Sequence, residues 1–171
     1  MSQTSRTPAR RRAMAAALIA LAALAAPAPV HAQEERPAMQ TQPARPAPAR
    51  SGHVRANGID YWYEIHGQGE PLLLLHGGLG SIDMFGPVLP ALAAQRQVIA
   101  LDLHGHGRTP LGNRPVSLID MGDDVAAVLR ELGYAQVDAM GYSMGGGVAF
   151  RLAVQHPQLV RRLVLVSAGY A

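Results

Sequence analysis

The five-residue segment GYSMG, which begins at Gly141 and ends at Gly145, constrains the fold of this chain more than any other feature. It lies between an apolar, strand-like run and a helix-like run over Gly146–Gln155. A serine on a sharp turn from a strand into a helix holds its hydroxyl clear of the sheet, where a base can reach it. The two backbones nearly touch at such a turn, so the residues two before and two after the serine must be nearly free of side chain. Gly141 and Gly145 meet that demand, and the segment therefore predicts a nucleophile at Ser143.

Residues 1–32 have the pattern of a signal peptide. Four arginines precede the apolar stretch Ala13–Ala26, which is short for a membrane span, and Ala32 completes a small-x-small cleavage site that would leave Gln33 as the first mature residue. An uncleaved membrane anchor is the alternative interpretation. We expect an exported protein, periplasmic or secreted by a route left open, with no stable membrane span after cleavage.

Residues 33–52 are rich in Pro, Ala and Arg and show no apolar periodicity, which indicates a flexible linker before a folded domain over 53–171. The formal net charge of +3 is misleading about partners. Residues 1–50 hold seven Arg against two Glu, whereas residues 51–171 hold eight Arg against ten Asp and Glu. Because the domain is slightly acidic and has no basic stripe, we expect no nucleic-acid partner.

Strand-like and helix-like runs alternate along the domain. Asn57-Gly58 is the residue pair that a tight hairpin turn favours, and it separates two short strand-like runs, His53–Ala56 and Ile59–Ile65. The further predicted elements are strands over Pro71–Leu75, Gln97–Leu101, Gln136–Met140 and Arg162–Ser167, and helices over Gly86–Ala94, Ser117–Leu132 and Ser143–Gln155. This alternation with short connections predicts an α/β fold: a mostly parallel sheet with helices on both faces.

These residues resemble the α/β-hydrolase superfamily, in its serine-nucleophile branch. Four elements occur in the expected order: the hairpin, His76-Gly77-Gly78 after the third strand, an Asp-x-x-Gly-x-Gly-Arg run from Asp102 after the fourth, and the elbow at Ser143. The resemblance extends from about Val54 to the last residue. It implies the amino-terminal portion of the fold, truncated after the sixth of eight strands.

The resemblance implies a chemistry that needs neither a cofactor nor a metal. Ser143 would attack the carbonyl of a small ester, lactone or related acyl substrate and form an acyl-enzyme. The oxyanion hole would consist of the backbone N–H groups of Met144 and of Gly78, with Leu79 as the alternative to Gly78. A serine rather than an aspartate at the elbow argues against the dehalogenase and epoxide-hydrolase branches, which attack through a carboxylate.

Several polar residues near these motifs are expected to support loops. His76 and Gly77 are expected to build the oxyanion loop, and Asp102 to organise its own loop rather than to serve as the catalytic acid. Asp102, His104 and His106 could also be read as metal ligands, since alternate residues of a strand share a face. The glycines between them indicate a loop instead, and we expect no metal site.

The catalytic acid and histidine are missing from the pattern. In the family they follow the nucleophile, but no Asp or Glu follows Ser143, and the one later histidine, His156, is expected to face away from the active-site end. His104 and His106 are poor substitutes, because the third strand should separate them from the elbow. Three hypotheses remain: an exported serine hydrolase represented by a truncated chain, inactive alone; a non-catalytic ligand-binding or signalling protein on a hydrolase scaffold; and an inactive gene fragment.

Overall fold

The computed structural model describes residues 46–169 of this chain. Its elements, in chain order, are β1 (Arg50–Ala56), β2 (Ile59–His66), β3 (Pro71–Leu75), the 3₁₀ turn η1 (Ile82–Phe85), α2 (Val88–Ala93), β4 (Gln97–Leu101), α3 (Leu118–Glu131), β5 (Val137–Tyr142), α4 (Met144–Gln155), the 3₁₀ turn η2 (Pro157–Leu159) and β6 (Val160–Val166). The signal peptide and most of the linker expected from the sequence lie outside the described residues. No helix between residues 46 and 169 has the length and apolar character needed to cross a bilayer.

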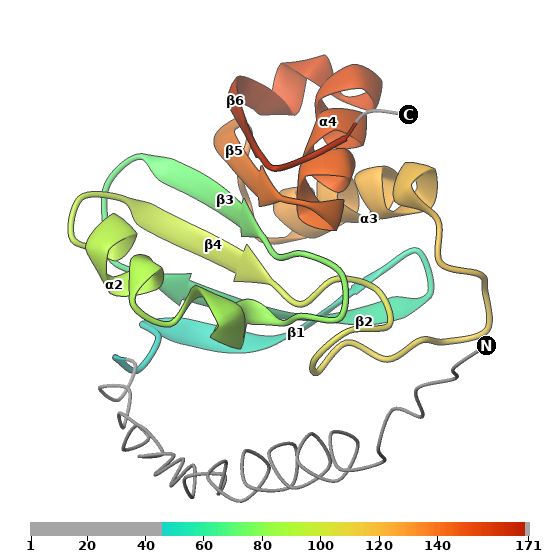
Figure 1. The fold of residues 1–171 in the computed structure, drawn as a ribbon, viewed down its shortest axis with the longest axis horizontal. Coiled ribbons are helices and arrows are strands. Elements are labelled where there is room, and N and C mark those ends of the chain that lie inside the picture. Colours follow the sequence, from blue (N-terminus) through green and yellow to red (C-terminus); the bar gives the residue numbers. More distant parts are fainter. Residues whose placement is uncertain (1–45, 170–171) are drawn as a thin grey trace, which may run out of the picture. The chain divides into compact units, whose positions relative to one another are not determined.

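The strands form one six-stranded sheet in the order β1-β2-β4-β3-β5-β6 (Figure 1). β1 and β2 are antiparallel, whereas β4, β3, β5 and β6 run parallel to one another. The expected mostly parallel sheet is thus confirmed. The chain passes from β3 to β4 on one side and then crosses back to β5 on the other, so the strand order reverses at β3. In open α/β sheets, ligands bind beyond the carboxyl ends of the strands at such a reversal.

The core lies on both faces of the sheet, as the sequence predicted. Leu72 and Leu74 of β3 pack on one face with Leu89 of α2 and with η1, whereas Leu73 and Leu75 pack on the other face with α3 and α4. All four leucines are buried. An uninterrupted apolar run is what a central parallel strand needs when helices cover it on both sides. Figure 1 shows α2 apart from α3 and α4 on these two faces.

The hairpin before β3 has the turn that the sequence predicted, but it starts earlier. Asn57 and Gly58 both have positive φ values, 48° and 88°, as a two-residue type I′ turn requires. β1 begins at Arg50, which pairs with Ile65, so residues 50–52 belong to the sheet and not to the linker. These residues carry no apolar alternation, and backbone pairing with β2 is what makes them a strand.

The helices follow the sequence prediction to different degrees. α3 is confirmed: Ser117 caps it by accepting a hydrogen bond from the Asp120 N–H at 3.3 Å, and Gly133 ends it with φ at 86°. The predicted helix over 86–94 is wrong in its first part, because the η1 turn precedes it and α2 begins only at Val88. Ser81 caps η1 by accepting from the Asp83 N–H, which starts the turn before the predicted helix.

Candidate active site

Ser143 occupies a strained backbone position between β5 and α4. Its φ and ψ are 49° and −116°, a region that residues with a side chain rarely adopt. Its N–H donates to the carbonyl of Val166 in β6 at 2.9 Å, and its side chain makes no capping hydrogen bond to α4. The side chain is exposed. The turn therefore presents a serine hydroxyl at the carboxyl end of the sheet.

The two flanking glycines are needed for close contact between backbones. A Cβ on Gly141 would lie 2.2 Å from the carbonyl oxygen of Gly145. A Cβ on Gly145 would lie 2.4 Å from the carbonyl oxygens of both Leu75 and His76 in the neighbouring strand and loop. Atoms cannot approach so closely, so either substitution forces the strand and the helix apart. Both positions therefore behave as the sequence pattern predicted.

The loop that follows β3 lies against the Ser143 turn. A Cβ built on Gly77 would lie 3.4 Å from Ser143 Cβ, and one on Gly78 would lie 3.9 Å from Met144 Cβ. Met144 is the first residue of α4, where backbone N–H groups have no partner within the helix. The N–H groups of Gly78, Leu79 and Met144 donate no hydrogen bond within residues 46–169. Unpaired donors thus lie beside the exposed hydroxyl.

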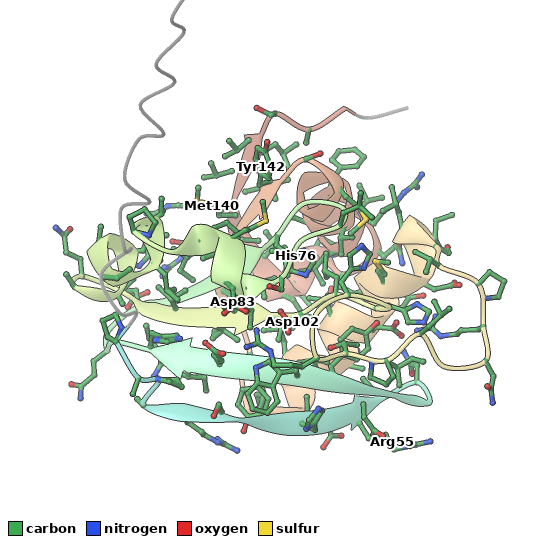
Figure 2. All side chains as sticks on the ribbon, turned by 60° about the horizontal axis from the view of Figure 1, so that its bottom comes forward. Arg55, His76, Asp83, Asp102, Met140 and Tyr142 are labelled. Carbon is green, nitrogen blue, oxygen red and sulfur yellow. The ribbon has the colours of Figure 1, made fainter. Side chains whose placement is uncertain are left out.

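His76 and Asp102 lie together where β3 and β4 end, and both are buried (Figure 2). His76 Nε2 accepts a hydrogen bond from the Leu103 N–H at 2.9 Å. Asp102 accepts from the N–H groups of Ile82 at 2.7 Å and Arg108 at 2.8 Å, and from Arg108 Nε at 2.6 Å. Burial opposes ionisation of Asp102, but the hydrogen bonds from Arg108 and Ile82 and the positive charge of Arg108 together outweigh it and lower the pKa of the carboxyl. Both side chains tie the loop after β3 to the loop after β4.

Arg108 is a structural partner that sequence reasoning did not single out. Besides Asp102, its guanidinium approaches Glu64 at 3.4 Å and lies 5.3 Å from the centre of the Trp62 ring. Thr109, the next residue, donates from its hydroxyl to the carbonyl of Asp102 at 2.7 Å. The arginine that closes the Asp-x-x-Gly-x-Gly-Arg run was the available signal.

Asp102, His104 and His106 do not converge on a common point. His104 Nε2 hydrogen-bonds to the carbonyl of Leu111, and His106 Nδ1 donates to the carbonyl of His104 at 2.9 Å. Asp102 is engaged with Arg108. Over residues 46–169, no three His, Asp or Glu side chains are placed to hold a metal ion.

No base contacts Ser143 within the described residues. Its hydroxyl has no hydrogen-bond partner there. β3 separates β5 from β4, whose following loop carries His104 and His106. The histidines of this part of the chain contact other groups: His53 packs edge-on against Trp62, His66 pairs with Glu64, His76 with Leu103, His104 with Leu111, His106 with the loop carbonyl and His156 with Asp123.

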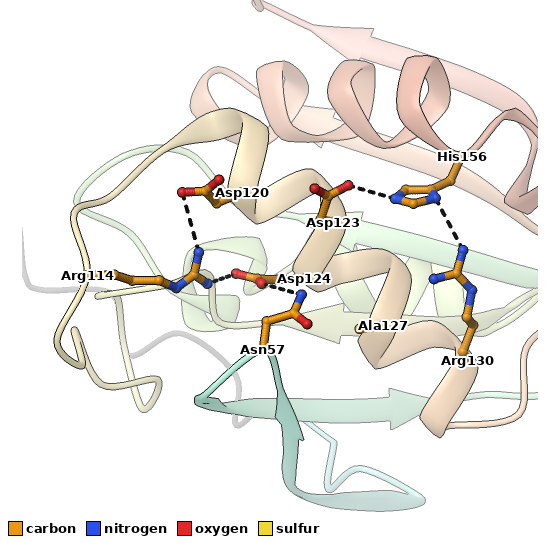
Figure 3. Close-up of a pocket in the computed structure, with 8 residues that line it drawn as sticks. All are labelled: Asn57, Arg114, Asp120, Asp123, Asp124, Ala127, Arg130 and His156. Atoms are coloured by element: carbon orange, nitrogen blue, oxygen red, sulfur yellow. Dashed lines mark hydrogen bonds and ion pairs between the residues drawn. The ribbon is translucent and has the colours of Figure 1, made fainter.

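Two cavities differ sharply in character. One, of about 260 Å³, adjoins the elbow through Tyr142 and is otherwise lined by apolar side chains: Met84, Phe85, Val88, Met140 and Val166. The other, of about 600 Å³, runs along α3 and is polar (Figure 3). Its charges are already paired, Asp124 with Arg114 and Asp123 with His156. The first cavity, not the second, adjoins the candidate nucleophile.

Comparisons with known proteins agree with this geometry. A family model of the alpha/beta hydrolase fold matches residues 70–171. A pimeloyl-[acyl-carrier protein] methyl ester esterase from Aeromonas hydrophila is 40% identical over 108 residues, which are 62% of this chain and 41% of the esterase. A soluble epoxide hydrolase from Corynebacterium sp. strain C12 is 40% identical over 114 residues, 65% of this chain and 39% of that protein.

A solved structure, described as Est816, an N-acyl homoserine lactone degrading enzyme, superposes with a TM-score of 0.66 and 31% identity, covering 69% of this chain and 46% of that one. The chain thus spans less than half the length of each of these proteins. The residues that the family model matches contain β3 to β6, the Ser143 turn and the loop that lies against it. On the family match, the strand order and the turn geometry together, this chain belongs to the α/β-hydrolase fold family.

Proposed function

We propose that this chain carries the nucleophile of a serine hydrolase that cleaves a small ester, lactone or related acyl substrate through an acyl-enzyme at Ser143. The observation that carries the proposal is the juxtaposition of an exposed serine at φ 49° with the unpaired N–H groups of Gly78 and Met144. The relatives include an esterase and an epoxide hydrolase, so family membership alone does not choose the reaction. A serine hydroxyl favours acyl transfer over the carboxylate chemistry of epoxide opening.

The proposed reaction has two halves. Ser143 Oγ attacks the carbonyl carbon while its proton passes to a base, and the oxyanion that forms accepts hydrogen bonds from Gly78 and Met144. The oxyanion then collapses, the alcohol leaves with a proton, and the acyl group remains on Ser143. Water repeats the sequence and releases the acid. Fixed donors matter because they require no rearrangement as the negative charge develops.

The base and its orienting acid are proposed to come from polypeptide outside residues 46–169. Every described histidine is engaged away from Ser143, and a serine without a base is a weak nucleophile at neutral pH. We therefore expect residues 33–171, expressed alone, to show negligible turnover. A soluble form of that fragment that hydrolyses p-nitrophenyl acetate, and loses the activity in Ser143→Ala, would overturn this part of the proposal.

The test of the nucleophile uses the protein purified from its native host, treated with a fluorophosphonate probe that reacts only with activated serines. We expect labelling at Ser143 that disappears in Ser143→Ala. Ser167→Ala is the matched control, because Ser167 also has φ at 49° but follows β6, which β5 separates from β3. Labelling that survives Ser143→Ala, or none in the native protein, contradicts the proposal.

A second candidate function is that of a binding protein on the hydrolase scaffold. Two observations favour it: no base contacts Ser143 within residues 46–169, and an apolar cavity lies beside Tyr142. It predicts ligand binding without labelling of Ser143, so the probe experiment separates the two functions.

We also propose that the protein is exported. The arginine-rich start, the apolar stretch Ala13–Ala26 and the small-x-small site ending at Ala32 support this. Amino-terminal sequencing of the native protein should begin at Gln33, and a protein that retains Met1 would contradict it.

A further inference from the structure

The hydrogen-bond partners of the two ring nitrogens of His76 determine which nitrogen carries the proton. Its Nε2 lies 2.9 Å from the Leu103 nitrogen, and a backbone N–H can only donate, so Nε2 must carry a lone pair. In a neutral imidazole the proton then sits on Nδ1. Nδ1 lies 2.7 Å from the carbonyl oxygen of Gly77, which can only accept. The two contacts agree on a single neutral tautomer with Nδ1 protonated.

The same hydrogen bond fixes the direction of the next peptide group. The Gly77 carbonyl accepts from His76 Nδ1 and also from the Gly80 N–H at 3.2 Å, so it points into the loop. A trans peptide is planar, with its C=O and N–H on opposite sides. The Gly78 N–H therefore points away from His76 and out of the loop. Gly78 is exposed and lies against Met144.

We propose that His76, as the neutral Nδ1–H tautomer, is a positioning residue that holds the Gly77–Gly78 peptide with the Gly78 N–H turned toward the oxyanion formed at Ser143. The inference deepens the proposed serine-hydrolase function and depends on it. His76 never touches the substrate; it acts through the carbonyl of Gly77. The φ and ψ angles on either side of a peptide between two glycines are little restricted, so this peptide is free to turn over unless a hydrogen bond holds it. We call the hydrogen bond from His76 Nδ1–H to the Gly77 carbonyl the clamp.

The clamp requires a neutral ring. Protonation would place an Nε2–H against the Leu103 N–H, and two donors cannot share a hydrogen bond. Burial, the main cause, lowers the pKa of His76. The charged and titratable groups that face the ring are Asp102, which favours the protonated form, and His106 and Arg108, which oppose it. The clamp is therefore complete at neutral pH, persists through the ordinary imidazole value of about 6.5, and is lost only as pH falls through the lowered pKa of His76.

Three substitutions separate positioning from mere packing. His76→Ala removes both contacts, His76→Asn keeps a donor near Nδ1, and His76→Gln keeps an acceptor near Nε2. Loss of one oxyanion donor typically lowers kcat by 10²–10³-fold. In the protein from its native host, with p-nitrophenyl acetate, we expect the Ala and Gln variants to lose roughly 10- to 100-fold in kcat with KM changed less than about threefold. The Asn variant should recover most of the loss.

A matched control accounts for lost stability. Val128→Ala shortens a buried side chain of α3, away from the loop after β3, and we expect a lower Tm with kcat retained. A kcat loss in Val128→Ala as large as that in His76→Ala at equal Tm would assign the effect to destabilisation. Equal kcat losses in the Asn and Gln variants would contradict the proposal that His76 positions the loop through its Nδ1–H.

A second measurement does not depend on activity. Nitrogen-15 NMR of the imidazole distinguishes the two neutral tautomers and the protonated ring. We expect the Nδ1–H form of His76 at pH 7. The Nε2–H form or a protonated ring at pH 7 overturns the clamp even in an active enzyme. If the spectrum is as expected but Ser143 is not labelled by the fluorophosphonate, the proposed function fails, and the catalytic role of His76 fails with it.

Discussion

The strained turn at Ser143 makes an unusual stability prediction: replacing the candidate nucleophile with glycine should stabilise the fold. Side chains at φ 49° and ψ −116° cost about 1–3 kcal/mol, and Ser143→Gly removes that cost. Glycine adds back about 0.5–1 kcal/mol through the greater entropy of the unfolded chain. The net expectation is a free energy of unfolding about 0.5–2 kcal/mol higher in Ser143→Gly than in Ser143→Ala, because alanine keeps the strained Cβ.

Urea unfolding of the two variants, followed by the fluorescence of Trp62 and by circular dichroism, measures this difference. Trp62 is the single tryptophan and lies in β2, so its signal reports the sheet. Ala127→Gly in α3 is the control for glycine in ordinary helical geometry, and it should cost about 1 kcal/mol. If Ser143→Ala proves as stable as Ser143→Gly, or more so, the turn is not strained and the account of the elbow is wrong.

Three further predictions concern the rest of the fold. Gly145→Ala should cost about 3 kcal/mol or more and lower the soluble yield, since its Cβ would lie 2.4 Å from the Leu75 carbonyl oxygen; a Tm close to wild type would refute the contact. Asp138 pairs with arginines that lower its pKa to about 2, so Asp138→Asn should cost about 1–2 kcal/mol at pH 7. That stabilisation is present above about pH 3.8 and lost as pH falls through about 2, which pH-dependent urea unfolding can check. Tyr61→Phe should cost about 2 kcal/mol, because the Tyr61 hydroxyl donates to buried Asp124 at 2.5 Å; a loss below about 0.5 kcal/mol would contradict that role.

Local patterns predicted much of the fold. β3 and β4 match their predicted bounds, because uninterrupted apolar runs, of five residues in β3 and of four after Gln97 in β4, leave little choice of register. The start of β1 could not be predicted, since Arg50 and its neighbours depend on pairing with β2 for their structure. The η1 turn was missed for a related reason: the Ile82 N–H is held by Asp102, a contact between residues twenty apart in sequence.

In the candidate site, too, some features could be predicted from the local sequence, whereas others depend on contacts between distant residues. The turn at Ser143 requires glycines on both sides for steric reasons, so it could be predicted from the sequence alone. The tautomer of His76 could not, because it is fixed by the N–H of Leu103 in another loop. The position of Arg108 over Trp62 could not be predicted either, because it depends on how β2 pairs with β4. The roles of Ser143, Gly78 and Met144 in catalysis stay predictions.

The most direct test of the central claim is to trap the acyl-enzyme. Protein from the native host, mixed with excess p-nitrophenyl acetate and quenched in acid, should carry one acetyl group on the tryptic peptide over residues 131–151, in which Ser143 is the only serine. The account predicts fragment ions that place the added mass on Ser143, and no such adduct in Ser143→Ala. An ester-hydrolysing protein with no acetyl group on this peptide, or with one that persists in Ser143→Ala, would contradict it.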